Sequence, residues 1–391
     1  MPSCLLRFSH VGKAATLISF CSAGSGGSSI CSGFLVKTVF YRFRKMAGEP
    51  PPKKVSAAKT IGTHNGTFHC DEALACFLLK QLPAYEDASI IRSRDNEVLS
   101  TCDIVVDVGG VYDPATNRFD HHQRTFSETM QSLDKSKKWT TKLSSAGLVY
   151  AHFGRDVIAR TLGWKLDDPN VEKIYDKVYE NFMEEIDAID NGVKMFDEEP
   201  RYRISTNLSA RVSHLNPPWN EPNPNPDEMF KKAVKLTGEE FLDRVRSYAT
   251  IWMPARDLVR AAIQQRQKVD ELGSIVVFSG GCCPWKEHLL ELEEELGVAG
   301  EVKFVLYEDE NKSWRVQGVP PTIGSFDCRR VFHPSPLVFL PKKWCGLRDK
   351  ELSDVSGIEG CIFVHSNGFI GGNKTREGAL EMALRTLRGV E

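Results

Sequence analysis

The feature that most constrains the fold of this sequence is a series of three polar segments, each placed where a strand would end. The segments are HNGTFHCDE at 64–72, DVGG at 107–110 and DHH at 120–122. An apolar, β-branched run at 104–106 precedes the second segment, and residues 118–119 precede the third. In open α/β sheets, ligand-binding side chains collect beyond the carboxyl ends of the strands. The series therefore predicts a parallel α/β sheet with a site along one edge.

Taken together, the imidazoles and carboxylates of these segments predict a metal site. This mixture suits a borderline-hard divalent ion such as Mn²⁺, and Mg²⁺ or Zn²⁺ is also compatible with it. Each segment alone has a simpler explanation, because His64 fits a hydrogen-bonded surface histidine, Asp71 fits a helix N-cap and 107–110 fits a turn. The order of the segments, and their shared position after strands, favours one joint metal site.

Hydrophobic patterning predicts strands and helices that alternate along the chain, as in an α/β protein. The first half comprises a loop entered by Ile61, strands at 89–92 and 104–106, and helices at 71–79, 144–163 and 169–191. The second half comprises a helix from Thr237 to about Leu272, strands at 274–278, 302–307, 314–319 and 361–364, and a loop insertion at 331–340. A capping-box sequence at 237–240 is expected to begin the long helix, and Pro254 is expected to kink it.

The length and these patterns predict a two-lobed α/β protein. At about 150 residues per domain, 391 residues correspond to two or three domains, or to two and a tail. The expected parts are a targeting leader and disordered segment at 1–58, a metal-binding domain at 59–228, a helical connector at 229–272 and a smaller α/β lobe at 273–391.

The beginning of the chain has the composition of a targeting segment. Residues 1–48 contain no acidic residue but several Arg, Lys and Ser residues, which is typical of a mitochondrial presequence. The alternative is a disordered tail without a targeting signal. A second methionine, Met46, precedes the sequence PPPKK at 50–54, a weak nuclear-type basic cluster. We therefore expect two destinations, the mitochondrial matrix and the nucleus.

Composition excludes several other classes of protein. Fifty basic and 52 acidic residues give a net charge of -2, so binding of nucleic acid would need a local basic patch. No apolar run is long enough for a membrane-spanning helix, and no membrane partner is expected. The eleven cysteines include no CxxC pair, which indicates free thiols in a reducing compartment rather than a zinc ribbon or a disulfide framework.

The three polar segments resemble the DHH phosphoesterase superfamily, and the form HNGxFHxDE is similar to the MYG family (melanocyte proliferating gene product). The likeness runs from about Ile61 to the C-terminus and includes LSSAG at 143–147, the segments at 185–192 and 209–211, and FIGG at 369–372. It does not cover the leader or the insertion at 331–340. The resemblance implies a two-lobed phosphoesterase fold with a catalytic N-terminal domain and a substrate-binding C-terminal lobe.

The resemblance also implies two Mn-type ions that share one bridging carboxylate. By this resemblance, one ion would be bound by His64, His69 and Asp107. The other ion would be bound by Asp71, Asp107, His121 and a later aspartate. As catalytic residues, Asp120 would orient His121 and His122 would lie toward the phosphate. Most members of the superfamily have Asp-x-Asp where this chain has His69-Cys70-Asp71, a departure that reduces negative charge and favours a softer ion.

Helical geometry helps to choose the later aspartate. Val178, Phe182 and Ile186 belong to one apolar face of the helix predicted from Pro169. Asp190 falls beside that face, whereas Asp187 falls roughly 60° further round, toward solvent. We therefore predict Asp190 as the ligand and keep Asp187 as a reserve ligand or outer partner.

The expected substrate contacts lie in the second half of the chain. Residues 363–376 are predicted to form a strand, a glycine-bearing turn and a helix start, where backbone amides can receive phosphate. The candidate substrate-binding residues are Arg211, His365, Gly371, Gly372, Lys374 and Arg376, with Arg201 and Arg203 nearby. Trp285 could stack a base, although burial in the core is favoured.

The resemblance implies a 3′-to-5′ exonuclease that acts on the 3′ end of RNA in mitochondria and in the nucleus or nucleolus. One alternative is a small-molecule phosphohydrolase for pyrophosphate or a short dinucleotide. Another is a metal-stabilised regulatory protein without turnover, which the change at His69 keeps open. The residues themselves leave the metal, the polarity, the choice of RNA and the oligomeric state open.

Overall fold

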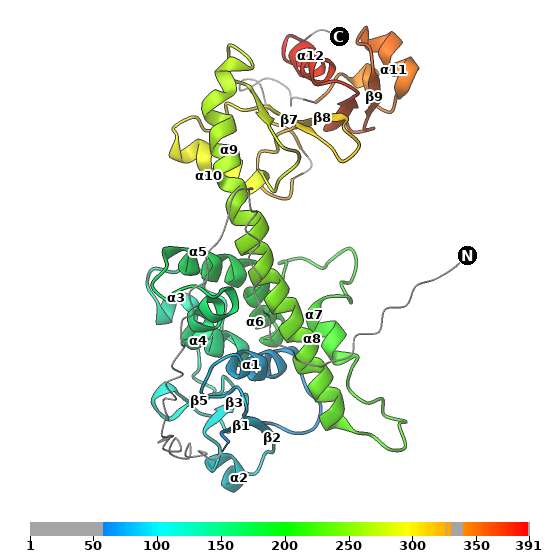
Figure 1. The fold of residues 1–391 in the computed structure, drawn as a ribbon. Coiled ribbons are helices and arrows are strands. Elements are labelled where there is room, and N and C mark those ends of the chain that lie inside the picture. Colours follow the sequence, from blue (N-terminus) through cyan, green and yellow to red (C-terminus); the bar gives the residue numbers. More distant parts are fainter. Residues whose placement is uncertain (1–57, 326, 330–338, 390–391) are drawn as a thin grey trace, which may run out of the picture. The chain divides into compact units, whose positions relative to one another are not determined.

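The computed structural model describes residues 58–325, 327–329 and 339–389. Almost all of the predicted leader and most of the insertion at 331–340 lie outside these residues. The described chain contains two five-stranded sheets with helices around each, which confirms the expected α/β class (Figure 1).

The first sheet is almost entirely parallel, as predicted. Its strand order is β2-β1-β3-β5-β4, and only β4 runs antiparallel, beside β5. The strands are β1 (Thr60–Thr63), β2 (Ser89–Arg92), β3 (Ile104–Val106), β4 (Tyr112–Asp113) and β5 (Arg118–Phe119). The loop expected at Ile61 is wrong, because Ile61 is fully buried in β1, next to the centre of the sheet. A strand with a single large apolar residue has too little alternation to be recognised from sequence.

Helices of the first half surround this sheet and, except for the helix at 96–100, share one hydrophobic core with it. They are α1 (Cys70–Lys80), α2 (Asn96–Ser100), α3 (Met130–Leu133), α4 (Ser145–Leu162), α5 (Pro169–Val178), α6 (Glu184–Asp190) and α7 (Leu208–Ser213). A 3-10 turn lies at Pro114–Thr116. Ser144 caps α4 and Gly163 ends it in a left-handed conformation, as the sequence predicted.

The helix predicted over 169–191 exists, but a π-helical turn at Tyr179–Met183 separates α5 from α6. A π turn takes more residues than an α turn, so it rotates every later side chain relative to a regular helical wheel. The expectation that Asp187 faces solvent is consequently wrong, because Asp187 is fully buried.

The long connecting helix begins eleven residues before the predicted start at Thr237. It starts as α8 (Pro226–Ser247), with Asn225 as N-cap and Pro226 in the first turn. Thr237 lies inside α8 and donates its hydroxyl to the Ala233 carbonyl. A π turn at Tyr248–Trp252 stands immediately before Pro254, where a kink was expected. The helix continues as α9 (Met253–Gln265) and ends in a 3-10 turn at Arg266–Lys268, short of Leu272.

The second sheet is mixed, with strand order β6-β7-β8-β10-β9. Only β6 and β7 are parallel, and the other neighbours are antiparallel. The strands are β6 (Ile275–Phe278), β7 (Phe304–Glu308), β8 (Trp314–Gly318), β9 (Cys361–Val364) and β10 (Ile370–Asn373). The helices are α10 (Lys286–Glu295), α11 (Asp349–Ser356), α12 (Arg376–Leu387) and a 3-10 turn at Lys342–Trp344.

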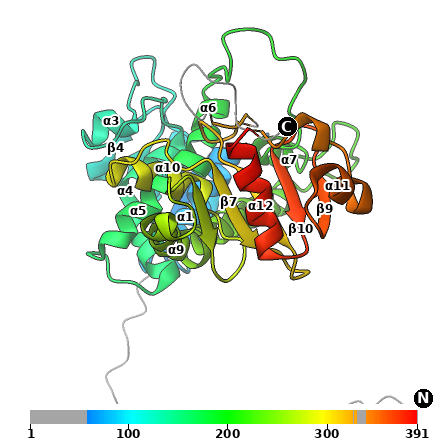
Figure 2. The ribbon, with the colours of Figure 1, turned by 90° about the horizontal axis from the view of Figure 1, so that it is seen from above.

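Two hydrophobic cores lie on the two faces of this second sheet. Helix α12 packs on β7, β8 and β10, and its Met382 joins Leu306 and Val316 in one core (Figure 2). On the other face, Leu289 of α10 and residues of α9 pack on Val305. Trp285 is 3% exposed in this second core, so the expected burial is confirmed.

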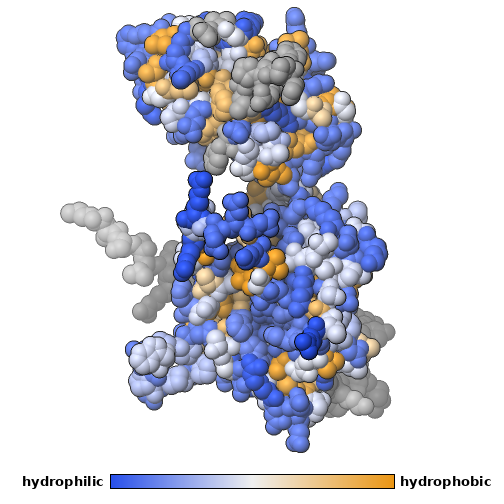
Figure 3. Space-filling view, turned by 180° about the vertical axis from the view of Figure 1, so that it is seen from behind, coloured by the Kyte–Doolittle hydropathy of each residue, from blue (hydrophilic) through white to orange (hydrophobic). Residues whose placement is uncertain are grey.

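Hydrophilic residues cover most of the surface seen in Figure 3, and hydrophobic residues appear there as separate patches. Among the described helices, none has the length and apolar character needed to cross a membrane. The cysteines in the described part of the chain are all free thiols, as the absence of a CxxC pair predicted.

Candidate metal centre

The candidate centre lies beyond the carboxyl ends of three neighbouring parallel strands. His64 follows β1, Asp107 follows β3, and Asp120 and His121 follow β5. Because β1, β3 and β5 are adjacent in the sheet, their ends meet along one edge. The first turn of α1 adds Asp71 to this edge, so the structure brings the three predicted segments together.

One group of possible ligands consists of His64, His69, Glu72 and Asp107, with one ligand atom of each within 4.8 Å of every other. The Nε2 atom of His64 lies 3.0 Å from Oε1 of Glu72 and 3.3 Å from Oδ2 of Asp107. Glu72 was not predicted as a ligand, because its sequence position fits a helix cap. It does accept the backbone N–H of His69, at 2.8 Å.

A second group consists of Asp71, His121 and Asp190, and Asp107 lies in a third with His121 and His122. The Nε2 atom of His121 lies 3.2 Å from Oδ1 of Asp107 and 3.1 Å from Oδ2 of Asp190. The same nitrogen lies 4.0 Å from Oδ2 of Asp71. One oxygen of Asp107 therefore faces His64 and the other faces His121, which is the position required of a bridging carboxylate.

Several buried atoms in these groups have unused bonding capacity. Both carboxylate oxygens of Asp71 and Nε2 of His121 are buried and form no hydrogen bond. Buried polar atoms in native proteins almost always have a partner, and coordination of an ion is one explanation of the exceptions. Nitrogen and carboxylate donors suit Mn²⁺, Mg²⁺ or Zn²⁺, so the residues fit the expected divalent cations.

The pKa values of the cluster also favour the binding of a divalent cation. Burial, reinforced by Asp107 and Asp190, raises the pKa of Asp71 well above its usual range. Burial opposes protonation of His64 and His121, but the neighbouring carboxylates outweigh it and raise both pKa values to about 10. Protons thus neutralise part of a dense negative cluster, and a divalent cation would supply the same compensation.

Asp107 is held in an uncommon backbone conformation at the centre of the cluster. Its φ angle is 59°, and the following Gly109 and Gly110 also have positive φ angles. Such conformations cost free energy and persist where the surrounding structure enforces them, often at functional sites. Ser145 donates its hydroxyl to Oδ1 of Asp107 at 3.1 Å, so the start of α4 helps to fix the carboxylate.

The expected role of Asp120 is wrong in one respect, because its partner is His122 and not His121. Oδ1 of Asp120 lies 2.7 Å from Nδ1 of His122, and its other oxygen accepts the N–H of Gly110 at 2.6 Å. His121 instead has its Nδ1 3.3 Å from the side-chain oxygen of Asn191. Adjacent motif residues point in different directions, and the sequence could not show which histidine reaches Asp120.

The sequence analysis missed a buried network behind the ligands. Asp187 accepts the backbone N–H of Ser144 at 3.0 Å, the hydroxyl of Ser144 at 2.7 Å and the hydroxyl of Tyr179 at 3.0 Å. Burial raises the pKa of Asp187 to about 7, although these hydrogen bonds oppose the shift. A Cβ atom on Gly147 would lie 2.3 Å from Oδ1 of Asp187. The segment LSSAG therefore combines a helix cap with a glycine that leaves room for this carboxylate.

None of the predicted substrate residues belongs to these groups, and two of them have a different setting from the one expected. Gly371 and Gly372 were placed in a turn but lie in β10, which pairs on both sides with β8 and β9. Backbone amides in a central strand serve the sheet, so Gly371 and Gly372 do not offer theirs to a phosphate as expected. The glycine-bearing turn itself lies before β10 and contains Gly368, with a φ angle of 70°.

The other predicted substrate residues lie in three different parts of the chain. Lys374 and Arg376 are exposed at the start of α12. The N–H of His365 donates to Ile370 in the β9–β10 connection. Arg211 forms an ion pair with Glu240 at 2.9 Å. Arg211 is exposed as well, but among the described residues no ion pair is formed by Lys374 or Arg376.

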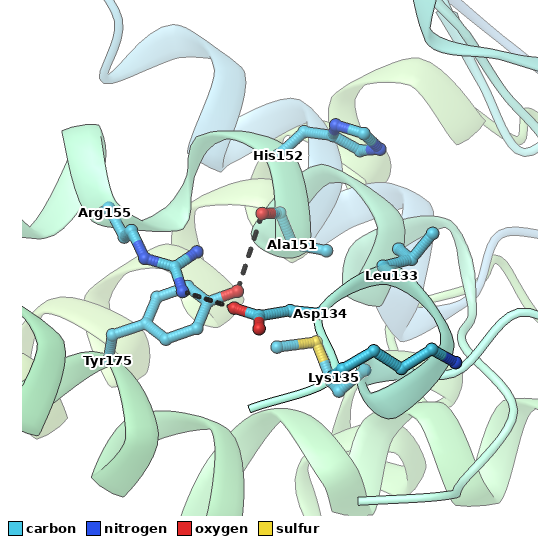
Figure 4. A pocket seen from close by; sticks show the side chains of 8 residues that line it. Leu133, Asp134, Lys135, Ala151, His152, Arg155 and Tyr175 are labelled. Carbon is cyan, nitrogen blue, oxygen red and sulfur yellow. Dashed lines mark hydrogen bonds and ion pairs between the residues drawn. The ribbon is translucent and has the colours of Figure 1, made fainter. Parts of the chain in front are cut away.

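A separate pocket of about 380 Å³ lies among α3, α4 and α5 (Figure 4). Arg155 at its wall contacts Asp134 at 3.3 Å and Glu172 at 2.7 Å, and the hydroxyl of Tyr175 donates to the Ala151 carbonyl at 3.5 Å. None of the possible metal ligands lines this pocket. Its arginine is already paired, so the strand-end cluster is the stronger candidate site.

Comparisons with known proteins identify relatives of this chain. Residues 60–387 match the family MYG1_exonuc, described as an uncharacterised protein family (UPF0160). The chain is 54% identical to the MYG1 exonuclease of Mus musculus, over 90% of this chain and 93% of that protein. It is also 54% identical to the MYG1 exonuclease of Homo sapiens, over 89% and 93%.

A more distant relative, the MYG1 protein YER156C of Saccharomyces cerevisiae, is 42% identical over 84% of this chain and 96% of that protein. A solved pGpG-specific phosphodiesterase from Vibrio, PggH, aligns with 85% of this chain and 98% of its own, at 14% identity and a TM-score of 0.27. The family match spans nearly all of the described residues and includes every possible metal ligand named above. The chain therefore belongs to the MYG1 exonuclease family.

Proposed function

We propose that this protein is a divalent-metal-dependent phosphoesterase that removes nucleotides from the 3′ end of RNA. The observation that carries the phosphoesterase proposal is the position of Asp107, whose two carboxylate oxygens face His64 and His121. This arrangement suits two cations that share one carboxylate. Such a pair would activate the attacking water and stabilise the leaving oxygen at phosphorus.

The protein's own residues have separate tasks in this proposal. The possible ligands at the strand ends would hold the cations, and Ser145 keeps Asp107 in place. His122 has a side chain that is 62% exposed, so it can reach a substrate phosphate. The hydrogen bond to Asp120 raises the pKa of His122, which favours a protonated ring near neutral pH. We assign to His122 the donation of a hydrogen bond or proton to the phosphoester.

The RNA substrate and the 3′-to-5′ direction rest on the family resemblance, and the compartments rest on that resemblance and on the composition of the first residues of the chain. Two relatives are named exonucleases, which supports action on the end of a nucleic acid. The acid-free composition of residues 1–48 supports a mitochondrial location, and the basic cluster after Met46 supports a nuclear or nucleolar one. We propose Mn²⁺ as the cation, with Mg²⁺ and Zn²⁺ as alternatives.

The test uses the full chain with Mn²⁺ and a single-stranded RNA that carries a 5′ label. We expect a ladder that shortens from the 3′ end, no cleavage of a circular RNA of the same sequence, and no ladder with Asp107→Asn. Asp167→Asn changes an exposed aspartate away from the cluster and should leave the ladder intact. Cleavage of the circular RNA would replace the exonuclease proposal with an endonuclease.

Pyrophosphate and short dinucleotides are tested beside the RNA. Hydrolysis of these small molecules with the long RNA left intact would establish the alternative of a small-molecule phosphohydrolase. If the folded, Mn²⁺-loaded protein hydrolyses neither RNA, nor pyrophosphate, nor dinucleotides, the alternative of a regulatory protein without turnover is favoured.

A further inference from the structure

On one face of the second sheet, the hydrophobic core described above extends over only part of the sheet. On this face, the hydrophobic core with α9 and α10 includes residues of β6 and β7 but none of β9 or β10. Phe363 of β9 belongs to none of the hydrophobic cores, and its ring lies on the side of β10 opposite Met382 of α12. The ring of Phe363 is partly exposed, and its cation–π contacts are with arginines.

Two arginines lie next to this ring. In the strand register, Gly372 of β10 stands opposite Phe363 on one side and Arg315 of β8 on the other. The guanidinium carbon of Arg315 is 5.2 Å from the ring centre, and that of Arg348 is 5.9 Å away. A Cβ atom on residue 372 would lie 2.6 Å from Nη1 of Arg315 and 3.1 Å from Cε1 of Phe363. The glycine in the central strand thus leaves the space in which the arginine meets the ring.

The two guanidinium groups differ in how accessible they are to a ligand. Nη2 of Arg315 pairs with Asp309, whereas its Nη1 is buried without a partner. Arg348 is exposed and forms no ion pair with any residue that the structure describes. Lys374 and Arg376, which follow β10, add two exposed positive charges nearby in the sequence. The whole chain has a net charge of -2, so this concentration of cations is local.

We infer that Phe363, Arg315 and Arg348 form a binding surface for single-stranded nucleic acid. A base stacks on Phe363, and the exposed guanidinium group of Arg348 contacts an adjoining phosphate, while Arg315, held by Asp309, lies against the ring. An aromatic ring flanked by arginines binds single strands with little sequence preference, because every base presents a flat π face. The inference rests on the proposed function and deepens it, since it assigns binding of the strand to residues outside the metal cluster.

The experiment measures binding without turnover. The full chain in EDTA is titrated into a fluorescent twelve-nucleotide single-stranded RNA, and anisotropy is followed at several salt concentrations. Phe363→Leu removes the ring but keeps an apolar side chain, and we expect binding to weaken about tenfold. Phe363→Trp keeps a ring and should restore binding. Arg348→Gln should lower the slope of log affinity against log salt by about 0.7, the value for one phosphate contact on a single strand.

Matched controls on the same lobe separate this surface from general effects. Val355→Ala changes a partly exposed apolar residue of α11, and Arg388→Gln removes an exposed arginine after α12. Both should leave affinity and salt slope unchanged. Circular dichroism and the melting temperature of Phe363→Leu establish that the variant is folded. Binding by Phe363→Leu and Arg348→Gln equal to that of the controls would overturn the inference.

Hydrolysis assays keep the two proposals distinguishable. RNA binding that depends on Phe363, without any hydrolysis of RNA in Mn²⁺, would support the surface and contradict the proposed exonuclease. Normal shortening of RNA by Phe363→Leu, with unchanged affinity, would support the exonuclease and remove the surface. A double-stranded RNA bound as tightly as the single strand would also contradict the surface, because paired bases cannot stack on the ring.

Discussion

The two sheets of this protein gather charged side chains in different ways. In the first sheet, the neighbouring strands β1, β3 and β5 are parallel, so the residues that follow them converge on one edge. In the second sheet, β8, β10 and β9 are antiparallel, and residues opposite one another share a face instead. All possible metal-binding groups among the described residues belong to the first sheet and its helices. Parallel topology thus concentrates ligands at a point, whereas antiparallel topology spreads ring and guanidinium groups over a surface.

The strongest test of the difference between the two sheets is a substitution of Asp107, the residue at which the strand ends of the first sheet meet. Asp107→Asn keeps the shape of the side chain but removes its charge from between His64 and His121. We expect hydrolysis to fall by on the order of a thousandfold, because electrostatic stabilisation of the reaction centre is lost. Single-strand binding in EDTA should stay unchanged. A variant with full activity would contradict the bridging role.

The second prediction concerns the pH dependence of metal binding. Both His64 and His121 have pKa values raised to about 10, so both rings carry a proton at neutral pH until a cation displaces it. Affinity for Mn²⁺ should therefore rise with pH, by up to about a hundredfold per pH unit if two protons leave. Calorimetry in buffers of different ionisation enthalpy counts these protons.

Two variants test this proton count. His64→Asn should release one proton fewer than the wild type. His214→Gln changes an exposed histidine away from the cluster and should leave the count unchanged. An affinity for Mn²⁺ that does not depend on pH between 6 and 8 would show that these rings are not ligands.

The third prediction concerns the buried carboxylate behind the cluster. Asp187→Leu leaves the donors of Ser144 and Tyr179 buried without an acceptor, which should cost about 2–4 kcal/mol in the free energy of unfolding. Asp187→Asn keeps an acceptor and should be much closer to the wild type. Urea denaturation of the metal-free protein measures both. Equal stability of the two variants would show that the network does not support the fold.

The smallest expected effect is on the orientation of His121. Asn191→Ala removes the side-chain oxygen that lies 3.3 Å from Nδ1 of His121, without touching the face of the ring toward the carboxylates. Affinity for Mn²⁺ should fall about 10–100-fold, as is typical when the partner of a metal-binding histidine is removed. Asn181→Ala, an exposed asparagine on the preceding turn, is the control. An unchanged affinity would assign the orientation of His121 to other groups.

The sequence predicted much of the cluster because strand ends and polar segments are both local patterns. It predicted six of the residues that the structure brings together, from His64 to Asp190. It missed Glu72, whose position beside a helix start has an ordinary capping explanation. It also misplaced Asp187, because a π turn five residues long shifts the helical phase and leaves no clear mark in composition.

The second lobe was harder to predict, since its arrangement depends on contacts between distant strands. The pair Gly371-Gly372 resembles a turn when only its neighbours in the chain are considered. It forms a central strand because Arg315 and Phe363 on the flanking strands, and Met382 on α12, need the space. Such a requirement becomes visible only once the pairing of β8, β9 and β10 is known.

The shared position of Asp107 has a thermodynamic consequence for the proposed pair of cations. If one carboxylate serves both positions, occupation of one position changes the free energy of occupying the other. Linkage makes that coupling reciprocal, so each cation alters the affinity for its partner by the same factor. Removal of cations by a chelator would then follow one joint isotherm instead of two independent ones.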